Sequence, residues 1–122
     1  MRIDKLVKAA VAALEDIKAR DIVVLDVKRM TSLFDRIIIA SADSSRQGKA
    51  LSTHVQEKLK ALGARVYGVE GEQAGEWILV DLGSVVVHIM QPAVRQYYKL
   101  EELWTPPARG TRRRGSSPRP GA

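Results

Sequence analysis

The 122-residue chain contains no cysteine, which excludes disulfides and thiolate metal sites, and no apolar run approaches the roughly 18 residues that a membrane-spanning helix needs. Its formal net charge is +6, but five arginines beyond residue 104 supply +5 of that excess and leave the rest of the chain almost neutral. We therefore expect one globular domain over residues 1–104, followed by a disordered basic tail rich in Arg, Pro, Gly and Ser over 105–122. We also expect a cytoplasmic protein without a membrane segment.

The N-terminal third predicts one helix and two strands. Residues 3–18 carry apolar side chains at helical spacing, and Asp4 lies where the dipole of the helix favours an acid. Residues 22–27 and 35–40 are rich in Val and Ile, a composition typical of buried strands. We expect both of these strands to be central in the sheet.

The middle of the chain predicts a second helix and a third strand. The segment 41–46 begins the helix, with Asp43 or Ser44 as its N-cap, and Gly63 is placed to end it in the left-handed conformation. A strand over 65–69 then completes a strand-helix-strand unit.

Residues 76–90 predict a β-hairpin with a two-residue turn at Gly83 and Ser84. This turn pairs Leu79 with His88 and, because side chains alternate along a strand, it separates two faces. The first face is wholly apolar and belongs to the core: Ile78, Val80, Leu82, Val85, Val87 and Ile89. The second face mixes apolar, acidic and imidazole side chains, as a partner-binding surface does: Trp77, Leu79, Asp81, Val86, His88 and Met90.

After Pro92 has ended the last strand, residues 94–104 can form one or two helical turns. Leu100, Leu103 and Trp104 are expected to attach this segment to the body. The predicted fold is therefore α/β (α+β), with about five strands in a mixed sheet, two main helices and a C-terminal antiparallel hairpin. If both helices pack on one side of the sheet, the face that carries Trp77 is left uncovered by this chain.

Each candidate contact residue on the second face also has a structural interpretation. Trp77 could be an ordinary core aromatic, but a strand whose other face already supplies an apolar layer favours the interface. Asp81 could satisfy backbone donors of the turn or pair with a basic side chain of a partner, and the sequence favours neither interpretation over the other. His88 could be a structural imidazole, and a metal site is not indicated, because His54 lies on a helix and no carboxylate triad accompanies either histidine.

The C-terminal segment adds three more candidate contacts. Arg95 could form a structural salt bridge or contact a partner, with the structural reading slightly favoured. Tyr97 and Tyr98 are adjacent, so in a helix they point about 100° apart and cannot both belong to the core. One of them is expected to be available to a partner.

An enzymatic interpretation centres on Ser41, Ser44, Ser45 and Arg46, because a strand-to-helix junction with a nearby cation can bind phosphate. Nucleotidyl transfer with two metal ions also needs clustered carboxylates, and no Asp-x-Asp follows this junction. We therefore assign Ser44 to capping and expect no catalysis and no cofactor. A nucleotidyltransferase-like enzyme or a nucleotide-binding domain stays as the alternative.

The order and spacing of several short motifs are specific together. They are 21–27 (DIVVLDV), 33–35 (LFD), 44–46 (SSR), 70–71 (EG), 75–77 (GEW), 80–81 (VD), 87–88 (VH) and 95–104 (RQYYKLEELW). In these the chain resembles the ribosomal silencing factor, or Iojap-like, family. The resemblance spans nearly all of residues 1–104 and does not include the tail.

The resemblance implies a small domain similar to a nucleotidyltransferase fold that has lost its chemistry. It also implies binding to large-subunit ribosomal protein fourteen at the face where the small subunit docks, which would block subunit joining and lower translation when nutrients are short. A homodimer through the same face is a further possibility. Auxiliary contacts with rRNA are a separate expectation for the arginines of the tail, Arg109, Arg112, Arg113, Arg114 and Arg119.

Overall fold

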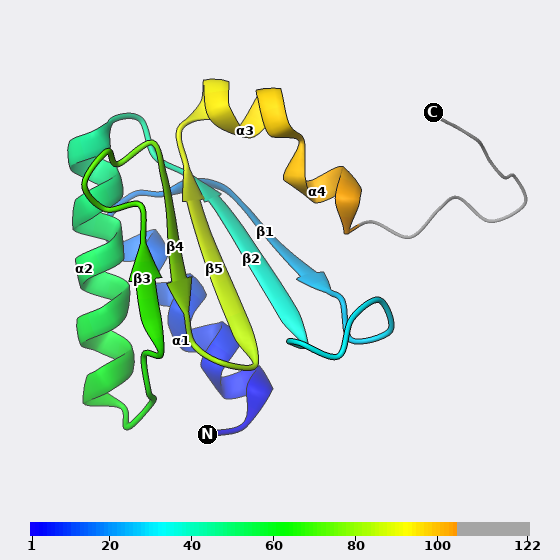
Figure 1. The fold of residues 1–122 in the computed structure, drawn as a ribbon. Helices are drawn as coiled ribbons and strands as arrows, with labels where there is room; N and C mark the ends of the chain where they lie inside the picture. Colours follow the sequence, from blue (N-terminus) through cyan, green and yellow to red (C-terminus); the bar gives the residue numbers. More distant parts are fainter. Residues whose placement is uncertain (105–122) are drawn as a thin grey trace, which may run out of the picture.

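The computed structural model describes residues 1–104, so the expected disordered tail over 105–122 and its five arginines lie outside the described residues. Five strands form one mixed sheet in the order β1-β2-β5-β4-β3 (Figure 1). Only β2 and β5 are parallel among these neighbours. The strands are β1 (Arg20–Asp26), β2 (Arg36–Ser41), β3 (Gly68–Glu70), β4 (Trp77–Asp81) and β5 (Val85–Met90).

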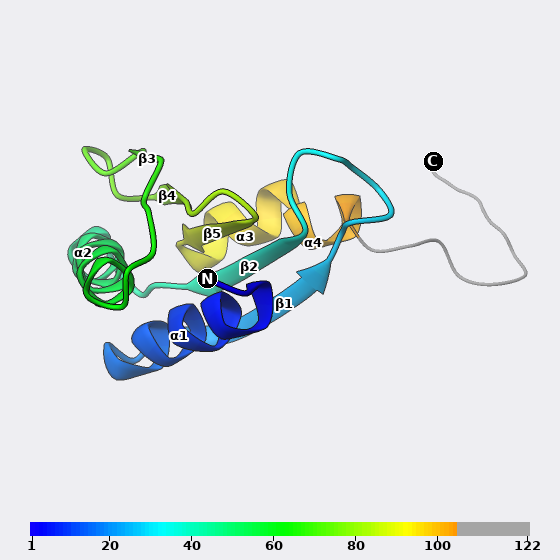
Figure 2. The same ribbon diagram turned by 90° about the horizontal axis from the view of Figure 1, so that it is seen from below.

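Four helices cover the two faces of this sheet. The long helices α1 (Ile3–Asp16) and α2 (Ser45–Ala61) lie together on one face, as Figure 2 shows, and the short helices α3 (Pro92–Tyr98) and α4 (Leu100–Leu103) lie on the other. The prediction of a mixed α/β fold with two main helices is confirmed. No helix within residues 1–104 is long and apolar enough to cross a membrane.

The hairpin has the predicted register, in which Trp77 pairs with Met90, Leu79 with His88 and Asp81 with Val86. Gly83 has a φ of +88°, a conformation that a glycine adopts without the steric cost of a side chain. The predicted apolar face packs against α1 and α2 in the main core. Its six members are all buried: Ile78, Val80, Leu82, Val85, Val87 and Ile89.

The opposite face of the sheet is not left open, which corrects the expectation that this chain leaves it uncovered. A second apolar cluster forms there between the sheet and the C-terminal segment. Its buried members are Val27, Ile37, Ile39, Met90 and Leu100, with Phe34, Trp77, Val94 and Trp104 packed around them. The segment folds back because α3 begins at Pro92, directly after β5, and Lys99 turns the chain between α3 and α4 in the left-handed conformation.

Several boundaries and positions differ from the predictions. β1 is an edge strand, with Val24 exposed, although its β-branched run predicted a central strand. The predicted third strand shortens to β3 at Gly68–Glu70, and the first helix ends at Asp16. Leu103 is exposed and does not attach the C-terminal segment, whereas Leu100 is buried and Trp104 packs on the second cluster.

The second helix begins and ends as the sequence predicts. Ser44 is the N-cap of α2, and its Oγ accepts a hydrogen bond of 3.1 Å from the backbone N–H of Gln47. Just beyond the helix Gly63 has a φ of +92°. Ser44 therefore acts as a cap, as assigned.

The loop before β4 approaches α2 so closely that only glycine fits at position 75. Gly75 has a φ of +76°, and a Cβ there would lie 2.8 Å from the Cβ of Ser45. We expect Gly75→Ala to lower the free energy of unfolding by about 3 kcal/mol, because a clash is added to left-handed strain. Gly63→Ala is the matched control, since no atom lies within 4 Å of its Cβ, and it should cost about 1 kcal/mol. If urea unfolding showed the same loss of unfolding free energy in Gly75→Ala and Gly63→Ala, the predicted clash at position 75 would be contradicted.

Candidate protein-binding face

A groove of about 600 Å³ lies on the face of the sheet opposite α1 and α2. We call it the sheet groove. Its floor is formed by side chains of β4 and β5, among them Leu79, Val86 and His88. The further side chains that line it come from the loop before β2, from the region of β3 and from the C-terminal segment: Leu33, Phe34, Tyr67, Glu70, Leu100 and Trp104.

Trp77 lies beside the sheet groove, where it is half-buried. It lines a smaller hollow of about 280 Å³ with Glu70, Gly71 and Leu79. Its Nε1 donates a hydrogen bond of 2.9 Å to Nδ1 of His88, and its ring centroid lies 5.0 Å from that of Tyr98. Trp77 thus joins the second cluster on one side and remains accessible on the other.

Asp81 combines both of the roles that its position suggested. Its Oδ1 accepts a hydrogen bond of 2.8 Å from the backbone N–H of Gly83, so it stabilises the turn of the hairpin. The same half-buried residue also lines the sheet groove, and Glu70 lies there too. The groove therefore carries two acids next to an apolar floor.

His88 is buried, with 8% of its surface exposed, yet it still borders the sheet groove. Burial lowers the pKa of its imidazole from the ordinary 6.5 to about 4. The ring is therefore neutral at neutral pH. The hydrogen bond from Trp77 supports a structural role for the His88 imidazole. It occupies only Nδ1, and the residue still borders the groove.

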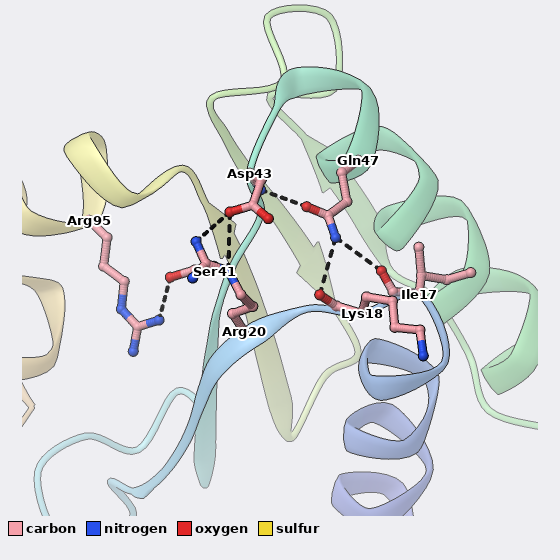
Figure 3. A network of polar contacts seen from close by, with 7 residues as sticks. All are labelled: Ile17, Lys18, Arg20, Ser41, Asp43, Gln47 and Arg95. Atoms are coloured by element: carbon pink, nitrogen blue, oxygen red, sulfur yellow. Dashed lines mark hydrogen bonds and ion pairs between the residues drawn. The ribbon is translucent and has the colours of Figure 1, made fainter.

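Arg95 and Met90 lie away from the surface, although both are among the predicted contact residues. Met90 is fully buried in the second cluster, and Arg95 is 9% exposed. Arg95 Nη1 donates to the carbonyl of Asp21 at 2.7 Å and to Ser41 Oγ at 2.8 Å. Its Nε and Nη2 donate to the two carboxylate oxygens of Glu101 at 3.0 and 2.9 Å. Arg95 therefore connects the C-terminal segment to β1 and β2, and Figure 3 shows its contact with Ser41 of β2.

The ion pair with Arg95 lowers the pKa of the Glu101 carboxyl below its ordinary 4.5. A lowered folded-state pKa stabilises the fold above the unfolded value and loses this contribution as the pH falls through the folded value. The C-terminal segment is thus held by charge at neutral pH.

Tyr97 and Tyr98 are both exposed, by 79% and 54%, whereas the sequence required only one of them to lie outside the core. Their rings meet edge to face with centroids 5.0 Å apart. Together with Trp77 they form an aromatic edge beside the sheet groove.

Sequence reasoning missed several residues that line the groove, among them Phe34, Tyr67, Glu70 and Trp104. A signal was present for Glu70, because β3 pairs with β4 and places Glu70 opposite Leu79 on the same face. Phe34 and Trp104 meet only in three dimensions, with ring centroids 5.5 Å apart. Nothing local in the sequence connects them.

The junction that suggested phosphate binding is occupied by contacts within the chain (Figure 3). Gln47 accepts a hydrogen bond from the backbone of Asp43, and its amide donates to the carbonyls of Ile17 and Lys18. Asp43 in turn pairs with Arg20. Across residues 1–104, no three His, Asp or Glu side chains are grouped so that they could hold a metal ion.

Comparison with known proteins places the chain in a family. The profile of the family described as "Ribosomal silencing factor during starvation" matches residues 1–119. The chain belongs to the ribosomal silencing factor family. It is 56% identical over 104 residues to "Ribosomal silencing factor RsfS" of Chromobacterium violaceum, and the match covers 85% of each chain. It is 36% identical over 99 residues to the protein of that name in Bacillus subtilis, and this match covers 81% of this chain and 84% of the other.

A solved structure of a similar protein has the same fold. The crystal structure of a Chromobacterium violaceum protein matches with a TM-score of 0.84 at 52% identity, covering 92% of this chain and 95% of that one. The fold assigned from the pattern of strands and helices is therefore that of the ribosomal silencing factor family.

Arg95 should stabilise this silencing-factor fold strongly. Arg95→Met removes the donor for the buried Ser41 hydroxyl and for the Asp21 carbonyl, and it removes the ion pair between Arg95 and Glu101. We expect the free energy of unfolding to fall by about 3 kcal/mol. Gln96→Met, at an exposed position on the same helix, should change it by less than about 0.5 kcal/mol. Comparable urea midpoints for the two variants would show that the network contributes nothing.

His88 should make the stability depend on pH. Between its ordinary pKa of 6.5 and its folded value of about 4, the unfolded chain binds a proton that the folded chain does not. Stability should therefore fall by up to about 3 kcal/mol as the pH drops through this window. In His88→Asn this part of the slope should disappear, and in His54→Asn, a change on the surface of α2, it should persist. Urea unfolding at a series of pH values measures this pH dependence of the free energy of unfolding. If the parent and His88→Asn showed the same dependence, its assignment to His88 would be refuted.

Proposed function

We propose that this chain represses translation by docking the sheet groove and its aromatic edge on large-subunit ribosomal protein fourteen. In this proposal the bound protein occupies the surface where the small subunit docks and prevents the two subunits from joining when nutrients are limited. The function is one of binding, without a catalytic step. It places the site of action in the cytoplasm.

The observation that carries the proposal is the composition of the uncovered part of the sheet. Leu79 and Trp77 offer half-buried apolar surface, Asp81 and Glu70 add negative charge, and the exposed Tyr97 and Tyr98 extend the surface beyond the groove. Aromatic side chains beside a partly buried apolar floor are typical of protein interfaces. A ribosomal protein that presents basic side chains around an apolar ridge would complement this surface.

The arrangement of the layers supports a steric effect. The proposed contact surface lies on one face of the sheet, whereas α1 and α2 cover the other (Figure 2). A molecule attached by the groove would therefore project its whole helical layer away from the ribosomal protein. Blocking by volume needs no further contact with the small subunit.

The five arginines of the tail extend the proposal to rRNA. Arg109, Arg112, Arg113, Arg114 and Arg119 lie outside the described residues, and their role is argued from charge alone. Phosphate contacts by all five would steepen the salt dependence of binding, each adding about −0.7 to the slope for single-stranded RNA.

Two substitutions test the docking face. Trp77→Ala should weaken binding to the large subunit about thirtyfold, because a buried interface tryptophan contributes about 2 kcal/mol or more. Asp81→Lys should weaken it at least about tenfold by placing a positive charge in the acidic groove. Sedimentation with separated ribosomal subunits measures binding, and a subunit-joining assay measures the consequence.

Matched controls on the opposite face separate docking from general damage. Leu62→Ala removes exposed apolar surface after α2, and Glu57→Lys makes the same charge change on the exposed side of α2. Both controls should bind and inhibit like the parent. If Trp77→Ala or Asp81→Lys, folded by circular dichroism, inhibited joining as well as the parent, the docking face would be wrong. A stable dimer that persists with ribosomal protein fourteen present, seen by light scattering, would assign the groove to a second copy instead.

A further inference from the structure

The hydrogen bond from Trp77 determines which nitrogen of the His88 imidazole carries the proton. Trp77 Nε1 lies 2.9 Å from His88 Nδ1, and an indole nitrogen can only donate a hydrogen bond. Nδ1 must therefore act as the acceptor and carry no proton. Because burial also keeps the ring neutral at neutral pH, its single proton is on Nε2.

The register of the hairpin determines where this proton lies. Trp77 pairs with Met90, towards the C-terminal end of β5, so Nδ1 faces that end. The two nitrogens lie on opposite sides of the long axis of an imidazole, so Nε2 points away from Trp77 and away from the backbone of β5. His88 lines the sheet groove, as its neighbours Val86 and Asp81 do, whereas Trp77 does not.

Nε2 has no hydrogen-bond partner among residues 1–104, although only 8% of the surface of His88 is exposed. Buried donors are almost always paired in native proteins, and an unpaired one opposes folding. An unpaired donor that borders an open groove is therefore expected to have its partner in another molecule.

We propose that His88 Nε2–H donates a hydrogen bond to a neutral oxygen of the docked protein, a backbone carbonyl or a side-chain amide or hydroxyl oxygen. A carboxylate is disfavoured, because Glu70 and Asp81 line the same groove. Trp77 then acts also as a positioning residue, since its indole N–H selects the tautomer that presents the donor. This inference rests on the proposed docking at the sheet groove and adds the chemistry of one contact.

The tautomer is measurable in the free protein by ¹⁵N NMR of the histidine side chains. We expect the His88 spectrum of a neutral ring with the proton on Nε2, and the second histidine, His54, serves as the internal comparison. In Trp77→Phe the selection should be lost and the two tautomers should mix. A proton on Nδ1 in the parent would overturn the proposal.

Two variants of His88 separate the two nitrogens. The amide of Asn reaches only the position of Nδ1, so His88→Asn keeps an acceptor for Trp77 and removes the donor of the groove. The longer Gln can place an N–H near the position of Nε2. We expect His88→Asn to bind isolated large-subunit ribosomal protein fourteen about tenfold more weakly and His88→Gln to remain within about threefold of the parent. His54→Asn, on α2, is the control.

The outcomes distinguish this inference from the docking proposal. If Trp77→Ala and Asp81→Lys lose binding but His88→Asn does not, docking at the groove stands and the donor is refuted. If the parent itself does not bind protein fourteen, both fail. Should the His88 variants not fold, the parent gives the answer, because the exchange of its Nε2 proton should slow when protein fourteen saturates it. Unchanged exchange in the saturated complex would overturn the proposal.

Discussion

The two-residue connection between β4 and β5 determines which side chains face a partner. Leu82 N–H donates to the Val85 carbonyl at 2.9 Å, and Gly83 takes up the positive φ that this tight turn requires. A slip of one residue would exchange the two faces of the strand. It would turn Trp77 and Asp81 towards α1 and α2. The ring of Tyr67 closes over Gly83, where a Cβ would lie 2.8 Å from it, so the turn is held from outside as well.

The C-terminal segment converts that flat face into a groove. α3 and α4 cover Ile39 of β2 and Met90 at the end of β5, and they leave the side chains of β4 and the rest of β5 bordering the groove. The segment is attached by apolar contacts of Leu100 and Trp104 and by the four hydrogen bonds of Arg95. Arg95 thus affects the proposed binding surface without belonging to it. It sets the position of the wall that carries Trp104.

The parts of the fold that sequence could predict are those with local causes. The hairpin register follows from alternation and one turn, and the cap of α2 follows from Ser44 and its neighbours. The edge position of β1 could not be predicted, because its composition is that of a central strand and only the order of the strands decides. The role of Arg95 was equally inaccessible, since Asp21 and Ser41 lie 74 and 54 residues away in the sequence.

The partial cover of the sheet reflects two opposed requirements. Burying Leu79 and Trp77 as completely as Met90 would add to the stability of the fold, because apolar burial is its main source. It would also remove the surface on which a partner could dock. Exposure therefore increases stepwise across the sheet, from the sealed Ile37 and Ile39 on β2 to the half-buried Leu79 on β4. His88 lies on the strand between them, where one nitrogen already has its partner within the fold and the other borders the groove.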